Sequence, residues 1–435
     1  MNHSISPQME WRPWKPKYGG GEPAFERKEG EKGTELLIAG SGKAEDIGAW
    51  IGTMPVKGGA HYRIAAKYVC SGIACEETAV LVQAIWNNTV RKTPFRDYIH
   101  HRRRLEGGKG ELHRIVQAPP EAESVELYLY LRQPAGGCVV WSGIEAVELD
   151  PHADDSLISR KARIVTTMVR SDPYPTTVEQ NLAKKLALLD QMKDDRPDLI
   201  CMTECMLDAN CYPSYEERAG NALAMDSVPI RALADKAREL RSYLTFSFFE
   251  NENGTLYNTA VLFGRDGEMV GKYRKTHLTT GEYDMGIVPG RELPVFQLDF
   301  GKVGLLICWD AWFTETARIL AMQGADIICV PLNGDGVPHH AEHVWPARAF
   351  DNGVYMVYSA AYKGSPSSII APNGQFLASV AGESVHQTVE IDLEKRNTLC
   401  PHLSVGLAIG EGKVLYFAER RPDLYSRYYT PGKRD

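Results

Sequence analysis

The chain has 435 residues, 43% of them hydrophobic and 24% charged, which is ordinary for a globular protein with at least one large core. Its formal net charge of -7 gives a mildly acidic surface, and this argues against nucleic acid as a partner. The length predicts about two or three domains.

The N-terminus and the cysteines indicate a cytoplasmic protein. The first residues contain no basic segment followed by an apolar stretch, so no signal peptide is expected. No run of about 18 apolar residues occurs, so no membrane association is expected. The nine cysteines lack the spacing of a disulfide framework, which is typical of thiols in a reducing compartment.

The first third of the chain has the pattern of an all-β domain. The first 20 residues, rich in Pro, Gly and Trp, are predicted to form an extended arm. From Phe25 to Leu149, short segments alternate apolar and polar residues between turn signals, which predicts half-buried strands. The expected strands are 34–38, 61–66, 79–84, 124–130 and 137–141. Residues 1–155 are therefore predicted to form a β-sandwich.

This sandwich is similar to jelly-roll domains of the carbohydrate-binding type. Such a domain can bind sugars through aromatic side chains, here Trp86 or Trp141. Tryptophans in strands more often lie in a core, so a structural role is the favoured interpretation.

After Lys161 the pattern changes to strands that alternate with helices. The expected strands are 162–169, 198–202, 243–249, 257–263, 303–308 and 326–330, and the expected helices are 177–193, 229–241 and 314–323. This alternation predicts a layered α/β fold. The second domain is expected to span residues 160–435, including a C-terminal extension.

Three reactive side chains follow apolar segments of this second domain: Glu204, Lys275 and Cys308. Open α/β sheets bind ligands at the carboxyl ends of their strands, so the three groups are expected to converge. A thiol attacks as the thiolate, and a neighbouring carboxylate can accept its proton. An ammonium favours the thiolate and stabilises an oxyanion, and the backbone N–H of Trp309 is a natural second donor.

This chemistry would hydrolyse an amide without a metal or an organic cofactor. The thiol would attack the carbonyl carbon, release an amine and leave a thioester. Water activated by the same carboxylate would then hydrolyse the thioester.

At these residues the sequence resembles the nitrilase superfamily, the carbon–nitrogen hydrolases. Its members carry Glu, Lys and Cys in this chain order. A second Glu follows the Lys ahead of a Pro-Gly turn, and Glu282 fits this position before Pro289 and Gly290. The matching segments are 202–204, 273–278, 308–315, 347–352 and 369–374. The resemblance covers roughly Lys161 to Arg396.

The resemblance implies an αββα layered sandwich and a homodimer or larger homo-oligomer formed through helices. It implies that Glu282 supports the site, and Trp309 and Asn333 are expected to hold the oxyanion or the substrate. The expected substrate is a small linear amide or an N-carbamoyl compound. Asp310 is more typical of amidase-type branches than of true nitrilases. A nitrilase that converts a nitrile to a carboxylate and ammonia remains an alternative, as does a weakly active glycan-binding member.

A zinc site is the remaining alternative. Residues His339 to His343 match H-x-x-E-H, a motif of zinc proteases. Two histidines four apart on a helix share one face and can bind zinc with a third ligand. However, Pro338 indicates a helix start or a loop, and the segment continues into the match at 347–352. No metal is therefore expected.

Overall fold

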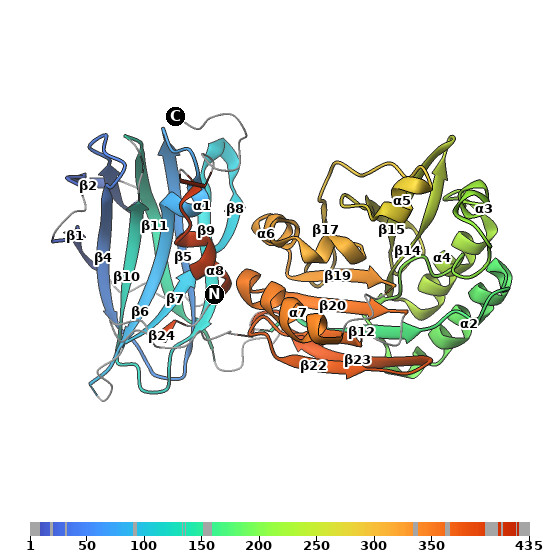
Figure 1. Ribbon diagram of the computed structural model, residues 1–435. Helices are drawn as coiled ribbons and strands as arrows, with labels where there is room; N and C mark the ends of the chain where they lie inside the picture. The colour runs from blue at the N-terminus through green and yellow to red at the C-terminus, as the bar shows by residue number, and fades with distance from the viewer. Residues whose placement is uncertain are drawn as a thin grey trace. The chain divides into compact units, whose positions relative to one another are not determined.

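The computed structural model describes residues 9–17, 21–30, 33–89, 94–132, 134, 136–150, 159–333, 338–361, 366–395, 408–409, 412–422 and 424–425. The chain divides into two compact units, which are both drawn in Figure 1. One unit is formed by Met1–Ile158 together with Arg396–Asp435, and the other by Ser159–Lys395.

The first unit contains two six-stranded sheets. The first sheet, in spatial order, consists of β1 (Glu10–Trp14), β4 (Ile47–Pro55), β10 (Ser124–Arg132), β6 (Val80–Asn87), β7 (Phe95–Ile99) and β24 (Ala408–Ile409). The second consists of β2 (Ala24–Gly30), β3 (Gly33–Ala39), β11 (Cys138–Glu148), β5 (His61–Ser71), β9 (Gly110–Gln117) and β8 (His101–Arg104). Two short helices, α1 (Glu76–Ala79) and η1 (Glu106–Gly108), join strands. The extended arm expected at the start includes β1, which pairs antiparallel with β4.

The two sheets enclose one apolar core, as expected for a β-sandwich. Trp86 and Trp141 are part of this core, with exposed fractions of 1% and 0%. The Trp86 ring nitrogen donates to the buried carboxylate of Asp97 at 2.8 Å, so its polar atom is satisfied inside the protein. Neither ring is accessible to a sugar.

The described C-terminal segments belong to the first unit. Strand β24 pairs parallel with β7, and helix α8 (Gly412–Ala418) packs on the outer face of the same sheet. Val414 and Ala418 of this helix contact the cluster Ala49, Leu81, Tyr98 and Tyr130. Glu419 accepts two hydrogen bonds from Arg132, at 3.0 and 2.9 Å. The sequence expectation assigned all of residues 160–435 to the second domain, whereas these contacts place the C-terminal segments on the sandwich.

The second unit also contains two six-stranded sheets. One consists of β16 (Met269–Arg274), β15 (Thr255–Phe263), β14 (Tyr243–Glu252), β13 (Leu199–Cys201), β12 (Lys161–Val169) and β23 (Ser384–Asp392). The other consists of β17 (Val295–Gln297), β18 (Lys302–Leu305), β19 (Ile327–Leu332), β20 (Tyr355–Ala360), β21 (Ser367–Ile370) and β22 (Phe376–Val380). The helices are α2 (Val178–Asp190), η3 (Lys193–Asp195), α3 (Tyr215–Gly220), α4 (Val228–Leu240), α5 (Thr280–Asp284), η4 (Cys308–Trp312), α6 (Thr314–Met322) and α7 (Pro338–Asn352).

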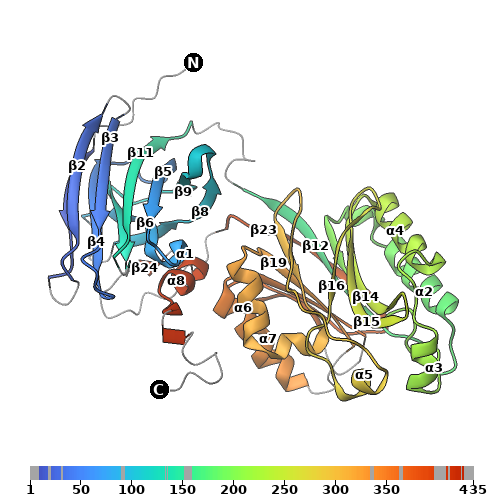
Figure 2. The ribbon, with the colours of Figure 1, turned by 90° about the horizontal axis from the view of Figure 1, so that it is seen from above.

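These elements form four layers in the order αββα, as Figure 2 shows. The apolar faces of α2 and α4 pack on the sheet that contains β14. On the other sheet, Trp345 of α7 stacks on Tyr358 at 4.1 Å between ring centroids. Gly304 lies under α6, where a Cβ would come within 2.9 Å of the Leu320 side chain. The expected α/β layered fold behind a β-sandwich is therefore confirmed.

Polar side chains join the two inner sheets. The Thr166 hydroxyl donates to the Tyr358 carbonyl at 2.6 Å, and the Ser359 hydroxyl donates to the Cys201 carbonyl at 2.7 Å. These bonds fix the strand ends against one another, which matters because the candidate site lies at these ends. In the ranges that the structure describes, no helix is long and apolar enough to cross a membrane.

Candidate active site

Glu204, Lys275 and Cys308 converge at the ends of three strands. Glu204 follows β13, Lys275 follows β16 directly, and Cys308 begins η4 after β18. The Lys275 Nζ donates to Glu204 Oε1 at 3.0 Å. The Cys308 thiol lies close enough to the Glu204 carboxylate and to the Asn333 backbone N–H for both to shift its pKa. The convergence expected from the strand ends is present.

The backbone at Cys308 forms a sharp turn. Cys308 has φ of 44°, a left-handed conformation that residues other than glycine seldom adopt and that costs on the order of 1–3 kcal/mol. The turn ends the buried segment after β18 and starts η4, so the thiol stands at the junction. Such strain persists only where the surrounding structure holds it, and it is common at functional sites.

The environment keeps the Cys308 thiol protonated. Burial raises the pKa of the thiol, and the negative charge of Glu204 raises it further. The Lys275 ammonium lowers the thiol pKa, as the sequence argument expected, but it does not outweigh the other two effects. The resting site therefore holds a neutral thiol beside a carboxylate.

Lys275 is a buried ammonium with an exposed fraction of 2%. It donates to Glu204 and to both oxygens of Glu282, at 2.9 Å each. Burial on its own lowers the pKa of Lys275, but the negative charges of Glu204 and Glu282 raise it well above its ordinary value. Lys275 thus remains charged and can stabilise a negative oxygen, but it is a poor base.

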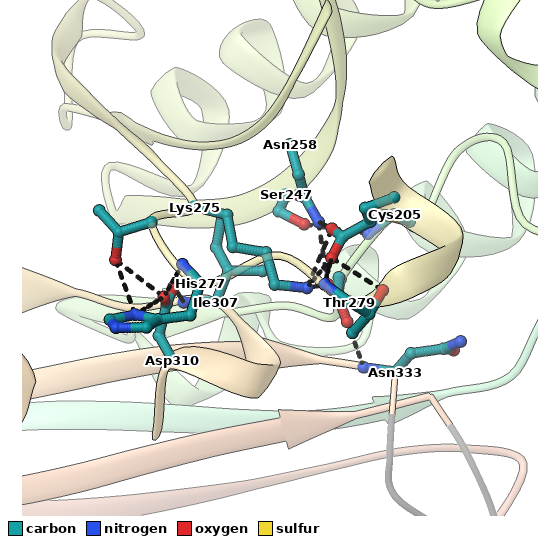
Figure 3. A network of polar contacts seen from close by, with 12 residues as sticks. Cys205, Ser247, Asn258, Lys275, His277, Thr279, Ile307, Asp310 and Asn333 are labelled. Atoms are coloured by element: carbon teal, nitrogen blue, oxygen red, sulfur yellow. Dashed lines mark hydrogen bonds and ion pairs between the residues drawn. The ribbon is translucent and has the colours of Figure 1, made fainter. Parts of the chain in front are cut away.

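Glu282 lies on α5, and its carboxylate is fully engaged. Besides Lys275, it accepts hydrogen bonds from Asn258 Nδ2 at 2.7 Å and from the backbone N–H and hydroxyl of Thr279 at 2.8 and 3.0 Å. Figure 3 labels the three residues that donate these hydrogen bonds, Lys275, Asn258 and Thr279. A carboxylate has about four acceptor positions, so Glu282 has little capacity left for a substrate proton.

Sequence reasoning missed Asn258. This buried side chain on β15 donates from Nδ2 to both Glu204 Oε1, at 2.9 Å, and Glu282 Oε1, at 2.7 Å. It therefore holds the two carboxylates in place through one group. The available signal was the amide of Asn258 close before the apolar run 260–263. An amide side chain is unfavourable in a buried strand unless it forms hydrogen bonds.

Asn333 and Trp309 lie beside the converging groups. The Asn333 backbone N–H donates to Glu204 Oε2 at 2.9 Å, and its side chain is exposed. The Trp309 N–H lies at the N-terminus of η4, where backbone N–H groups have no partner within the helix. The Trp309 ring is half-exposed, with centroid distances of 5.7 Å to Trp312 and 5.8 Å to Phe313.

The H-x-x-E-H segment lies in the first part of α7. The side chains of His339 and His340 lie outside the described residues. Across the part of the chain that the structure describes, no three His, Cys, Asp or Glu side chains form a group that could hold a metal ion.

Comparisons with known proteins identify the family of the second unit. The sequence profile of the carbon-nitrogen hydrolases matches residues 165–398, which is more than half of the chain. An omega-amidase of Homo sapiens is 28% identical over 268 residues, covering 57% of this chain and 91% of the relative. An N-carbamoylputrescine amidase of Arabidopsis thaliana is 32% identical over 241 residues, covering 51% of this chain and 80% of the relative.

A solved structure shares the fold of this region. The crystal structure of an amidase from Nesterenkonia sp. has a TM-score of 0.51 and 22% sequence identity, and it covers 62% of this chain and 97% of that chain. The match of the family profile begins after the sandwich. The chain therefore belongs to the carbon–nitrogen hydrolases, the nitrilase superfamily, and hydrolyses carbon–nitrogen bonds other than peptide bonds.

Proposed function

We propose that this protein hydrolyses a small linear amide or an N-carbamoyl compound through an acyl-enzyme on Cys308, and that it releases ammonia or an amine. The observation that carries the proposal is the shared carboxylate. Glu204 binds the Lys275 ammonium at 3.0 Å and lies near enough to the Cys308 thiol to raise its pKa. One group can thus accept the thiol proton while its neighbour stabilises the oxyanion.

In the first half of the reaction, the Cys308 sulfur attacks the carbonyl carbon while Glu204 accepts the thiol proton. Because burial and Glu204 raise the thiol pKa, the proton leaves during the attack and not before it. The Lys275 ammonium and the Trp309 N–H stabilise the oxyanion. The carbon–nitrogen bond then breaks, and Glu204 returns the proton to the departing nitrogen.

In the second half, Glu204 accepts a proton from water while the water oxygen attacks the thioester carbon. The same two donors stabilise the second oxyanion. The carbon–sulfur bond breaks, the acid leaves, and the proton on Glu204 returns to the sulfur. For an amide the acid is a carboxylic acid, and for an N-carbamoyl compound it is a carbamic acid, which decomposes to CO₂ and an amine. Glu282, Asn258 and the Asn333 N–H act through Lys275 and Glu204, which they hold in position.

The first test is product release from a panel of short amides, N-carbamoyl amino acids and aliphatic nitriles, with wild type and Cys308→Ala side by side. Ammonia would be measured enzymatically, and the carboxylate would be measured by mass spectrometry, so that substrates with larger leaving amines are also detected. Release by wild type that Cys308→Ala lacks supports the thiol mechanism. Activity on nitriles alone would replace the proposed amidase with a nitrilase, and undiminished activity of Cys308→Ala would refute the mechanism.

We propose in addition a homodimer or larger homo-oligomer. Two large apolar side chains of α6, Ile319 and Met322, have exposed fractions of 41% and 46%, and Phe350 of α7 is also exposed. Apolar surface of this kind is typical of protein interfaces. A cytoplasmic location is also proposed, because every cysteine in the described ranges is a free thiol.

A further inference from the structure

Asp310 is a fully buried carboxylate, with an exposed fraction of 0%, that the reaction above does not use. It lies on η4, close after Cys308. Its Oδ2 accepts from the Tyr273 hydroxyl at 2.7 Å and from the Ile307 backbone N–H at 3.1 Å. Its Oδ1 accepts from the Thr276 hydroxyl at 3.0 Å and from the His277 backbone N–H at 2.9 Å, and it contacts His277 Nδ1 at 3.0 Å.

These contacts join two segments that are distant in the sequence. Tyr273 and Thr276 flank Lys275 on either side, whereas Ile307 directly precedes Cys308. Figure 3 shows Asp310 with His277 and Ile307 beside the backbone that carries Lys275. One carboxylate therefore ties the segment of the ammonium to the turn of the thiol.

We propose that Asp310 is a positioning residue that sets the separation between the Lys275 ammonium and the Cys308 thiol. This role rests on the proposed function, in which both groups act on the same carbonyl. It also explains how the left-handed backbone at Cys308 is held, because Ile307 and Asp310 enclose that residue. Further support comes from the stacking of His277 on Phe313, at 4.0 Å between centroids, directly after η4.

A carboxylate is required at this position, and an amide of the same shape does not replace it. The N–H groups of Ile307 and His277 are fixed backbone donors that face opposite oxygens of Asp310. An asparagine would direct its NH₂ group at one of them in either orientation, and two donors would then face each other. The hydroxyls of Tyr273 and Thr276 can rotate away, but the backbone donors cannot.

A role through charge alone and the positioning role of Asp310 predict opposite effects on Cys308. If the charge alone mattered, its removal would lower the pKa of the thiol and accelerate alkylation. If Asp310 holds Lys275 in place, its removal weakens the effect of the ammonium, raises the thiol pKa and slows alkylation. The groups that face Cys308 are Glu204 and Lys275, and those that face Asp310 are Tyr273 and His277.

The test is alkylation of Cys308 by iodoacetamide, measured by mass spectrometry of the peptide that contains it, between about pH 6 and 9. We expect Asp310→Asn to slow the reaction by roughly 10- to 100-fold and to shift its profile to higher pH. Thr276→Val, which removes one donor to Asp310, should give a smaller effect in the same direction. Thr276→Ser keeps the hydroxyl and should recover most of the rate.

Asp299→Asn is the matched control, because this exposed carboxylate binds Arg265 and is expected to leave alkylation unchanged. Circular dichroism would establish that each variant folds. If Asp310→Asn does not fold, the alkylation rates of Thr276→Val and Thr276→Ser test the positioning role in its place. Folded variants that alkylate at or above the wild-type rate would overturn the positioning role. Alkylation needs no substrate, so slowed alkylation in a protein without amide turnover would refute the proposed function and leave the positioning role standing.

Discussion

Replacement of Glu282 by Gln separates two roles that its position allows. As the holder of Lys275, Glu282 makes two contacts of 2.9 Å with the ammonium. As a base, it would exchange protons with the substrate directly. Gln keeps the shape and one acceptor oxygen, so Glu282→Gln should retain one of the two charged contacts and lose the other. In either orientation its NH₂ group also faces the ammonium together with the donor of Asn258 or of Thr279.

The expected loss follows from that contact. A hydrogen bond to a charged group contributes about 1.5–3 kcal/mol, which corresponds to roughly 10- to 150-fold in rate. Glu204→Gln removes the proton-transfer group itself and should cost about 100- to 10,000-fold. The assay is kcat and KM on the best amide of the panel, together with the pH profile of kcat/KM.

Glu282→Gln should lower kcat more than it changes KM and should keep both limbs of the pH profile. The reasoning would be refuted if Glu282→Gln were as damaging as Glu204→Gln and removed one limb of the profile. Such a result would mean that Glu282 transfers protons, despite its bonds to Asn258 and Thr279.

Three further predictions concern stability, reactivity and assembly. Lys275→Met leaves Glu204 and Glu282 without the cation between them, so the free energy of unfolding should fall by about 3–5 kcal/mol. The midpoint of thermal unfolding, measured by calorimetry, should then fall by roughly 6–20 °C, and an unchanged midpoint would contradict the buried ion pair. Because the thiol pKa is raised, alkylation of Cys308 should still accelerate at about pH 9, where the thiol of an unstructured cysteine peptide, with a pKa of about 8.5, is already levelling off. A profile like that of the peptide would argue against the protonated resting state. Wild type should exceed the 48.4 kDa of one chain in light scattering, and the double variant Ile319→Glu, Met322→Glu should approach that mass; a monomeric wild type would end the proposal.

The sequence allowed the site to be predicted where reactive side chains lie at the ends of predicted strands. Glu204 and Cys308 each follow an apolar segment and Lys275 follows the end of β16, so their convergence could be predicted from the geometry of α/β sheets. The roles of Asn258 and Asp310 could not be predicted this way, because each depends on partners that come together only in the folded chain.

The C-terminal segments were beyond prediction for a different reason. Strand β24 has two residues and helix α8 has seven, which is too short for a periodic pattern to be recognised. Their place in the first unit depends on pairing with β7, a strand more than 300 residues earlier in the chain. No local propensity carries that information.

The charges of the proposed site favour the attack without large reorganisation. Before attack, Glu204 is negative and receives the Lys275 hydrogen bond at 3.0 Å, while the thiol is neutral. When Glu204 accepts the thiol proton, its own charge disappears as the oxyanion forms, so the total charge around Lys275 is unchanged. The ammonium then exchanges one anionic oxygen for another, while its two contacts with Glu282 stay in place. Preorganised donors of this kind stabilise a transition state because they need not reorient as the charge moves, and this is why the holders of Lys275 matter as much as the reacting groups.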